Sequence, residues 1–214
     1  TAKALMNMVP FSGSAQLNGQ ELHGLKDEAL RAVRRDLQMV FQDPWAALNP
    51  RKTIFDLVGE PLLIHEQMPA VQRTERVAQL LQQVGLPAEA MRRYPHQFSG
   101  GQRQRAFLAM VLAQDTPLIL LDEPTTYLDI NHQVELMRLM VELKRQGKTV
   151  VTVLHDLNQA SRYCDHLVVL ASGRVMAQGA PEAVMKPELL KTVFSVEAEI
   201  HPEPVSGRPM CVVK

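Results

Sequence analysis

The sequence predicts an α/β fold in which a parallel sheet carries functional groups and a helical segment is inserted between its strands. An apolar run over residues 118–121 ends on Asp122 and Glu123, and a second apolar run ends on His155. Between residues 43 and 115 the sequence changes to helices interrupted by prolines. Because the carboxyl ends of parallel strands border the ligand crevice of an open sheet, these polar groups are expected to face a ligand.

The part of the chain before residue 43 predicts short elements that lead to a buried strand. Asn18-Gly19 marks a tight turn, and Pro10 ends a helical pattern because proline cannot donate a backbone hydrogen bond. The strand ends on Gln42. The expected elements are a helix over 1–10, a strand with its turn over 13–19, a helix over 27–35 and a strand over 37–41.

The rest of the chain predicts amphipathic helices that alternate with apolar strands. Apolar residues recur at helical spacing over 73–84, which predicts a face buried in a core, and Gly147 closes a later helix. The expected elements are helices over 73–84, 101–114, 131–145 and 156–163, strands over 118–121 and 150–154, a hairpin over 167–179, a helical segment over 182–194 and a surface tail over 201–214.

Composition limits the possible functions. The 214 residues suffice for one core, and 23 basic residues balance 23 acidic ones, so no overall charge favours nucleic acid. Cys164 and Cys211 lack metal-ligand spacing and are interpreted as free thiols in a reducing compartment. No apolar run has the length of a membrane span. A membrane role is therefore expected to come through a partner.

The polar residues suit phosphate chemistry. A Gly-Gly pair leading into a helix directs backbone N–H groups at an anion, and Ser99 adds a hydroxyl donor before Gly100 and Gly101. Asp122 could hold Mg²⁺, and Glu123 could deprotonate an attacking water. Each feature alone is more often a loop, a solvated turn or a surface residue. Their occurrence together and in this order predicts a nucleotide site.

The combination resembles the nucleotide-binding subunit of ABC transporters, and the resemblance covers nearly all of the chain. The matching residues are Ser99-Gly100-Gly101-Gln102 with the signature motif, residues 118–124 with the Walker B strand and its catalytic Glu123, Tyr127-Leu128-Asp129 with the D-loop, His155 with the switch histidine, and Gln42 with the Q-loop glutamine.

The resemblance implies a P-loop NTPase-like, RecA-like core with an inserted helical subdomain, and it implies ATP and Mg²⁺ as ligands. The implied core comprises residues 1–42 and 116–200, and the helical subdomain residues 43–115. The implied site residues are Glu123, His155 and Gln42 for catalysis; Ser99, Gly100, Gly101, Gln102, Asp129 and Thr1 for nucleotide; and Asp122, with Gln42 through water, for the metal.

One part of the family pattern does not occur in the sequence. The family's phosphate-binding loop, Gly-x-x-x-x-Gly-Lys-[Ser/Thr], would come immediately before Thr1, and Gly147-Lys148-Thr149 lacks the earlier glycine at the needed spacing. The sequence is therefore interpreted as an N-terminally shortened piece of a longer reading frame. The chain alone is expected to be inactive as an ATPase.

The two halves of the sequence resemble different importers. Residues 41–51 are similar to ATPases of dipeptide and oligopeptide importers, and the stretches from Asp129 to Ala160 and over residues 193–197 are similar to those of ferric siderophore and ferric citrate importers. The iron-chelate interpretation rests on the longer resemblance. A catalytically incompetent subunit is a further alternative. An ABC ATPase of DNA repair or translation is disfavoured, because zinc-type cysteines, a coiled-coil insertion and a second cassette do not occur.

The resemblance also implies partners and a location. Two ATPase subunits, identical or different, would pair head to tail at the cytoplasmic face of the membrane. The outer surface of the helical subdomain would receive permease subunits, and the segment 44–51 is a candidate edge of that groove. Trp45 is either part of this edge or a core aromatic. A periplasmic or lipoprotein solute-binding protein would act indirectly.

Overall fold

The computed structural model describes residues 12–25, 27–40, 48–126 and 128–214. The chain divides into two compact units, Thr1–Val153 and Leu154–Lys214, and each is described by itself. The expected helix over 1–10 and the residues Thr1, Gln42, Trp45 and Tyr127 lie outside the described residues.

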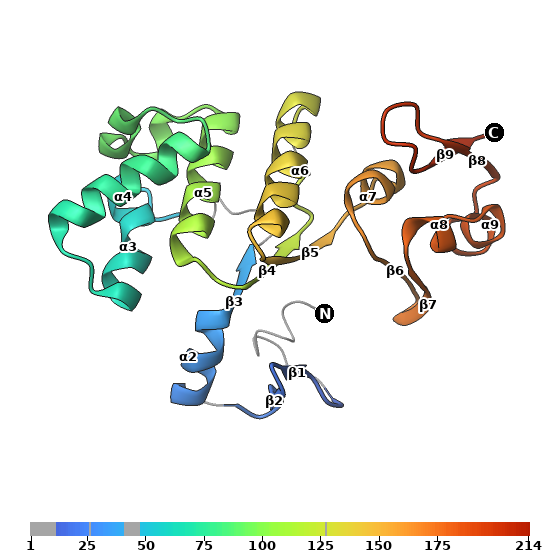
Figure 1. Cartoon of the computed structure of the whole chain (residues 1–214), viewed down its shortest axis with the longest axis horizontal. Helices are drawn as coiled ribbons and strands as arrows, with labels where there is room; N and C mark the ends of the chain where they lie inside the picture. Colours follow the sequence, from blue (N-terminus) through green and yellow to red (C-terminus); the bar gives the residue numbers. More distant parts are fainter. Residues whose placement is uncertain (1–11, 26, 41–47, 127) are drawn as a thin grey trace. The chain divides into compact units, whose positions relative to one another are not determined.

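The first unit is built on a three-stranded parallel sheet, as the sequence predicts (Figure 1). Its order is β3 (Leu37–Val40), β4 (Leu118–Asp122) and β5 (Thr149–Val153), so β4 lies in the centre. Leu37 pairs with Leu118, which in turn pairs with Thr149, so the strands start level. Residues 119–121 of β4 are buried, as expected of a strand with neighbours on both sides.

Short elements precede the sheet. β1 (Gln16–Leu17) and β2 (Gln20–Glu21) form an antiparallel hairpin, and α2 (Asp27–Asp36) leads directly into β3. Asn18 and Gly19 both have positive φ, at 51° and 79°, which is the geometry of a tight hairpin turn. The turn and strand predicted for residues 13–19 are confirmed.

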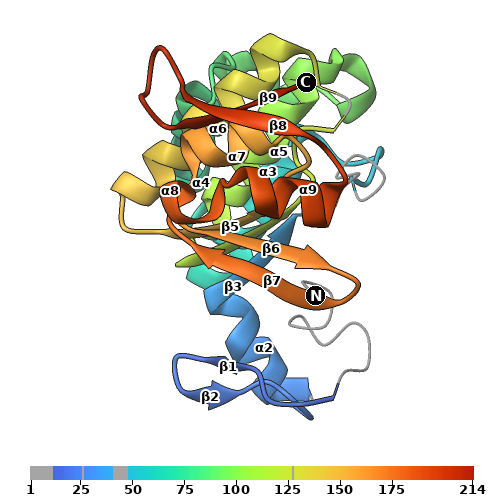
Figure 2. The same ribbon diagram turned by 90° about the vertical axis from the view of Figure 1, so that its right-hand side faces the viewer.

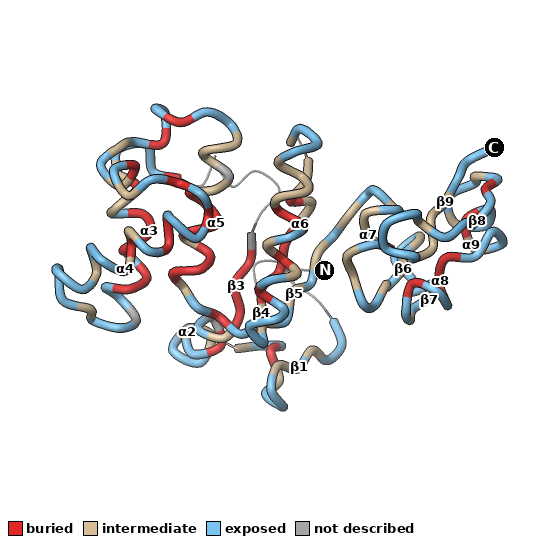
Figure 3. The backbone as a smooth tube through the Cα atoms, turned by 45° about the horizontal axis from the view of Figure 1, so that its top comes forward, coloured by how far each residue is buried: buried red, intermediate tan, exposed pale blue. Residues whose placement is uncertain are grey.

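A group of helices lies between β3 and β4 in the sequence. It comprises α3 (Ile54–Glu66), α4 (Ala70–Gln83), the short 3₁₀ helices η1 (Ala88–Arg92) and η2 (Pro95–Gln97), and α5 (Gly100–Gln114). Thr53 caps α3 in a reciprocal pair with Asp56. Val77, Leu80 and Leu81 of α4 are buried, which confirms the predicted core face (Figure 3). The burial of this apolar face stabilises the helical group by roughly 25 cal/mol per Å² of apolar surface removed from water.

The helix α6 (Ile130–Arg145) connects β4 to β5. It begins at the cap residue Asp129 and turns its apolar face inward, with Leu136, Met137, Met140 and Leu143 buried. Gly147, with a φ of 85°, follows the helix and leads into β5. A parallel pair of strands requires such a crossover helix.

The second unit consists of short helices and two hairpins (Figure 2). Its elements are α7 (Leu157–Tyr163), β6 (Leu167–Ala171), β7 (Arg174–Gly179), α8 (Pro181–Val184), α9 (Pro187–Phe194), β8 (Ala198–Pro202) and β9 (Pro209–Val213). The predicted hairpin of β6 and β7 is confirmed. The predicted helical segment is two helices, because Pro187 starts a new helix after Met185 and Lys186 leave helical geometry.

The surface tail predicted for residues 201–214 is wrong. Residues 209–213 form β9, which pairs with β8 from Ala198 opposite Val213 to Pro202 opposite Pro209. Both prolines stand at the end of the ladder next to the connecting loop, where a missing N–H costs little, and the apolar run 210–213 has strand propensity. The prolines therefore delimit the hairpin and do not exclude it.

Two further features concern the described residues as a whole. Within the described ranges, no helix is both long and apolar enough for a membrane span. Cys164 and Cys211 are free thiols, as the sequence predicts.

Candidate functional site

The carboxylate pair lies where the central strand of the sheet ends. Asp122 is the last residue of β4 and pairs in register with Val153 of β5, and Glu123 follows it outside the ladder. Both residues are half-buried. The expectation that Asp122 and Glu123 stand at the carboxyl end of a parallel strand is confirmed.

Glu123 has an unusual backbone conformation. Its φ of 50° lies in the left-handed region, which costs a non-glycine residue about 1–3 kcal/mol. A turn holds it there, because the backbone N–H of Thr126 donates to the carbonyl oxygen of Glu123 at 3.2 Å. The hydroxyl of Thr126 also lies 3.5 Å from Glu123 Oε2. This turn takes the chain sharply away from the sheet at the residue expected to act as the base.

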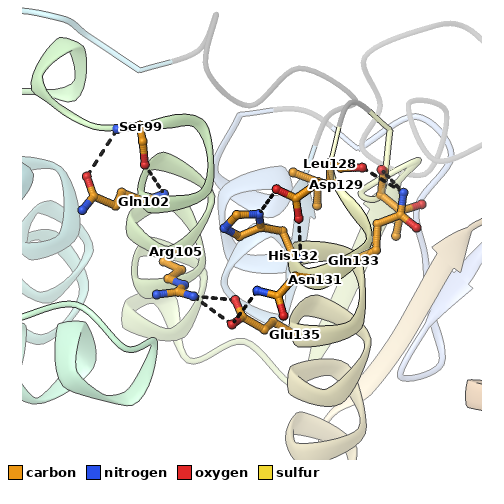
Figure 4. Close-up of polar contacts among 10 residues, drawn as sticks. Ser99, Gln102, Arg105, Leu128, Asp129, Asn131, His132, Gln133 and Glu135 are labelled. Atoms are coloured by element: carbon orange, nitrogen blue, oxygen red, sulfur yellow. Dashed lines mark hydrogen bonds and ion pairs between the residues drawn. The ribbon is translucent and has the colours of Figure 1, made fainter.

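The four residues Ser99 to Gln102 form the first turn of α5. Ser99 is the cap residue: its Oγ accepts from the backbone N–H of Gln102 at 3.4 Å, and Gln102 Oε1 accepts from the backbone N–H of Ser99 at 3.3 Å (Figure 4). This reciprocal capping box explains why the helix begins here. A Cβ added to Gly100 would meet no heavy atom within 4 Å. The start of α5 is thus open at Gly100 and carries the positive end of the helix dipole.

Gly101 is enclosed by a residue of another helix. A Cβ added at this position would lie 1.9 Å from Nε2 of His132 on α6, well inside any tolerable contact distance. An alanine at position 101 would therefore force the ring of His132 or the helix to shift, independently of any backbone N–H that Gly101 offers to an anion.

Asp129 caps the helix α6. Its Oδ1 accepts from the backbone N–H of His132 at 3.0 Å, and its Oδ2 lies 2.7 Å from Nδ1 of the same histidine (Figure 4). These bonds from His132, the backbone one first, lower the pKa of Asp129 below its ordinary value of 3.8. Both carboxylate oxygens are thus in contact with His132, and the predicted contact of Asp129 with nucleotide stays a prediction.

The two arginines that follow the signature glycines are held by protein groups. Arg105 Nη2 contacts both carboxylate oxygens of Glu135 on α6, at 2.6 and 2.8 Å, and Arg103 Nε donates to the carbonyl oxygen of Phe98 at 2.9 Å. Arg105 is thus paired with a carboxylate of α6, whereas Arg103 bonds a backbone carbonyl just before its own helix. The assistance with phosphate considered for Arg103 and Arg105 receives no support from these contacts.

The structure brings together only part of the predicted site. Gly101 and Asp129 meet through His132, within the first unit. His155 belongs to the second unit, so its convergence with Glu123 stays a prediction. Thr1 and Gln42 lie outside the described residues. The sequence prediction missed His132, although its position three residues after a capping aspartate was a local signal that its backbone and ring would face that carboxylate.

The donor set at the end of β4 suits Mg²⁺. This ion prefers oxygen ligands, keeps several waters and is commonly bound through one or two carboxylates together with substrate phosphates. Asp122 supplies one such carboxylate. Over the described ranges, no cluster of three or more His, Cys, Asp or Glu side chains gathers to form a metal cage. The residues present therefore fit a Mg²⁺ ion that arrives with a phosphate ligand.

Comparison with solved structures defines the class of protein. The chain is similar to a dimeric ATP-binding cassette, MJ0796, in a post-hydrolysis state with ADP and phosphate: TM-score 0.73, 31% identity, 84% of this chain and 78% of that one. It is also similar to cbiO1 of Clostridium perfringens, part of the cbiONQ ABC transporter complex: TM-score 0.75, 27% identity, 89% of this chain and 75% of that one. The fold is that of the P-loop NTPase-like ATPase cassettes.

Comparison of sequences defines the family. Residues 1–126 match the family described as ABC transporter. The achromobactin transport ATP-binding protein CbrD of Dickeya dadantii is 42% identical over 205 residues, which cover 95% of this chain and 75% of the relative. The di/tripeptide transport ATP-binding protein DppF of Pseudomonas aeruginosa is 39% identical over 203 residues, which cover 93% of this chain but only 63% of the relative. The chain belongs to the ABC transporter family.

Proposed function

We propose that this chain is the ATP-binding and ATP-hydrolysing subunit of an ABC importer whose solute is a ferric siderophore or another iron chelate. Family membership supports the ATPase part of the proposal. The relative CbrD is named for achromobactin transport, and FepC of Escherichia coli, 39% identical over 210 residues, for ferric enterobactin transport. The resemblance of the second half of the sequence favours the same solute class.

The observation that carries the proposal is the pair Asp122 and Glu123 at the end of the central parallel strand. In open parallel sheets this end borders the ligand crevice. Asp122 closes the ladder, and Glu123 leaves it in a strained left-handed conformation, as residues at functional sites often do. A buried strand that ended in an ordinary solvated turn would not need this strain.

The proposed chemistry assigns a separate task to each carboxylate. Asp122 would hold Mg²⁺, which when bound neutralises charge on the β- and γ-phosphates of ATP. Glu123 would accept the proton of a water aligned with the γ-phosphate, and a base in hydrogen-bond reach of its water accelerates such a step by about 10²–10⁴-fold. Thr126, 3.5 Å from Glu123 Oε2, would help to fix the orientation of this base.

The remaining predicted residues would complete the site. His155 would hydrogen-bond the γ-phosphate, and Gln42 would contact the water and the metal. Thr1 would lie at the last hydroxyl of the phosphate loop. Two subunits would pair so that Ser99, Gly100, Gly101 and Gln102 of one close over the ATP of the other, with Asp129 near the shared nucleotide. This closure would drive the permease between its two states.

The first experiment replaces the proposed base. In a full-length protein that carries a phosphate loop before Thr1, we expect Glu123→Gln to reduce ATP turnover at least about a hundredfold and to trap an ATP-bound dimer. Glu142→Gln, on the exposed side of α6, is the matched control and is expected to leave turnover unchanged. Undiminished hydrolysis by Glu123→Gln would remove Glu123 from this role.

A hollow on the helical group is the proposed contact for the permease. It has a volume of about 320 Å³ and lies along α3 and α4. Phe55, Gly59, Leu63 and Arg73 line it, together with the ion pair of Lys52 with Glu60. Leu63 is 51% exposed, so it offers apolar surface to a partner. Docking there would place the ATPase on the cytoplasmic face of the membrane as a peripheral subunit.

This contact can be tested with substitutions at two neighbouring apolar residues, Leu63 and Ile64. Leu63→Glu is expected to abolish copurification with the permease while basal ATP hydrolysis stays unchanged, because it replaces the exposed apolar side chain of the hollow with a third acidic group beside Asp56 and Glu60. Ile64, 62% exposed and outside the hollow, supplies the control Ile64→Glu. Equal copurification of both variants would contradict the assignment of the hollow.

A peptide solute is the second candidate. The resemblance of residues 41–51 to dipeptide and oligopeptide importers and the similarity to DppF favour it. Uptake of a labelled ferric siderophore and of a labelled dipeptide by cells that express the importer distinguishes the two. An incompetent subunit, the third alternative, would bind nucleotide only together with an intact partner, so nucleotide titration of the protein with and without that partner tests it.

A further inference from the structure

The start of the signature helix and the D-loop are connected by one side chain, that of His132. Its Nε2 fills the space beside Gly101, where an added Cβ would lie 1.9 Å away, with Cδ2 and Cε1 of the ring at 2.5 Å. The imidazole therefore packs directly on the α-carbon of a signature glycine. This contact spans thirty-one positions of sequence between two helices of the same unit.

The other edge of the same ring is fixed. Nδ1 of His132 lies 2.7 Å from Asp129 Oδ2, and the backbone N–H of His132 donates to Asp129 Oδ1 at 3.0 Å. The ring cannot rotate away from Gly101 without leaving Asp129. The side chain of His132 is about one quarter exposed, so surrounding atoms also restrict it.

A second contact joins the same two helices. One turn further along each helix, Nη2 of Arg105 on α5 contacts both carboxylate oxygens of Glu135 on α6, and Asn131 Nδ2 donates to Glu135 Oε1 at 3.4 Å (Figure 4). This pair joins α5 and α6 without touching Gly101 or Asp129, so it can be weakened while the contact of His132 stays in place.

We propose that His132 is a positioning residue that couples the D-loop to the signature motif of the same subunit. A displacement of Asp129 at the interface between two subunits would move His132 and, through it, Gly101. The signature would then reach the partner's ATP only when the D-loop is seated. This inference rests on the proposed ATPase function and adds a residue to it that none of the predicted motifs contains.

The test uses the full-length protein with a phosphate loop, in wild-type form and with Glu123→Gln to trap the dimer. We expect His132→Ala to raise the ATP concentration for half-maximal dimer formation about tenfold and to lower kcat by a similar factor, the range of typical couplings between sites. Nucleotide affinity of the monomer should not change, because the signature contacts ATP only across the dimer. Loss of a purely structural residue would change the nucleotide affinity of the monomer together with dimer formation.

A second variant covers the case in which His132→Ala fails to fold. His132→Asn keeps an amide donor near the position of Nδ1 for Asp129 but removes the ring edge that contacts Gly101. It should therefore keep the cap of α6 and still lose dimer formation to a similar extent. Wild-type dimer formation and kcat in His132→Asn would overturn the proposal.

The matched control is Glu135→Gln, which weakens the ion pair with Arg105 between the same two helices and leaves His132 in place. We expect its dimer formation and kcat to stay within twofold of wild type. Equal losses in Glu135→Gln and His132→Ala would show a general effect of helix packing and overturn the proposal. Failure of the wild type to hydrolyse ATP would overturn the proposed function, and the inference with it.

Discussion

The contact between Gly101 and His132 predicts that substitutions at these two positions are strongly coupled in stability. Gly101→Ala places a methyl group 1.9 Å from His132 Nε2 and 2.5 Å from two ring carbons, so the imidazole or the helix must shift. His132→Ala removes the obstacle. The effect of Gly101→Ala should therefore reverse when His132 is absent.

The magnitude follows from two opposing terms. Forcing a methyl group into a filled site costs about 1–3 kcal/mol, whereas alanine favours a helix over glycine by up to about 1 kcal/mol. The helix term is common to both backgrounds and cancels in the double-mutant cycle. The coupling free energy between Gly101→Ala and His132→Ala should accordingly equal the overpacking term, about 1–3 kcal/mol.

The assay is urea unfolding of the four proteins of the cycle, followed by circular dichroism and checked by thermal melts. For a chain of this length each kcal/mol corresponds to roughly 2–4 °C in Tm. In the His132→Ala background, Gly101→Ala should raise the midpoint or leave it unchanged. Additivity within about 0.5 kcal/mol would refute the contact as the reason for glycine at position 101.

Three further predictions concern other parts of the chain. The hydrogen bond from the hydroxyl of Ser14, and after it those from backbone N–H groups, lower the pKa of Glu21 from 4.5 to about 2. The ionised Glu21 therefore stabilises the fold fully above about pH 4.5, and this stabilisation is lost as the pH falls through 2. Ser14→Ala should raise the pKa of Glu21 in an NMR titration. Ser161, fully buried, donates to a β9 carbonyl at 2.6 Å, and Ser161→Ala should cost about 1–3 kcal/mol in urea unfolding. A double-mutant cycle of Arg105 and Glu135 should give a coupling of about 0.2–1 kcal/mol that falls as salt is added.

Each of these predictions has a control or a contradicting outcome. An unchanged pKa of Glu21 in Ser14→Ala would show that the backbone donors alone hold it low. The control for Ser161→Ala is Thr192→Ala, which removes an exposed hydroxyl that donates to a carbonyl within α9 and should lower the free energy of unfolding by under about 0.5 kcal/mol. An equally small loss in Ser161→Ala would contradict a stabilising hydrogen bond between α7 and β9. A coupling between Arg105 and Glu135 that is insensitive to salt would show that packing dominates this pair.

The sequence predicts those features that depend on local pattern. The apolar run before Asp122 specifies a central buried strand, and the spacing of Val77, Leu80 and Leu81 specifies a core face. The helix predicted over 101–114 is observed at Gly100–Gln114, one residue longer, with Ser99 and Gln102 in a capping box at its start. In each case the determining interactions lie within one element or between an element and the core.

The features that sequence reasoning missed depend on contacts between distant segments. No local pattern indicates that His132 fills the space beside Gly101, since this depends on how α5 packs against α6. The hairpin of β8 and β9 was missed because Pro202 and Pro209 suggested a tail. Pairing places both prolines opposite each other at the end of the ladder next to the connecting loop, which only the register reveals.

At position 123, the residue that would be best for stability differs from the residue proposed for catalysis. A glycine or an asparagine would adopt a φ of 50° with less strain than a glutamate does. Selection of random variants for heat resistance alone should therefore enrich Gly or Asn at this position. Such survivors would melt later and turn over no ATP, as expected when a protein retains an unfavourable residue for the sake of its chemistry.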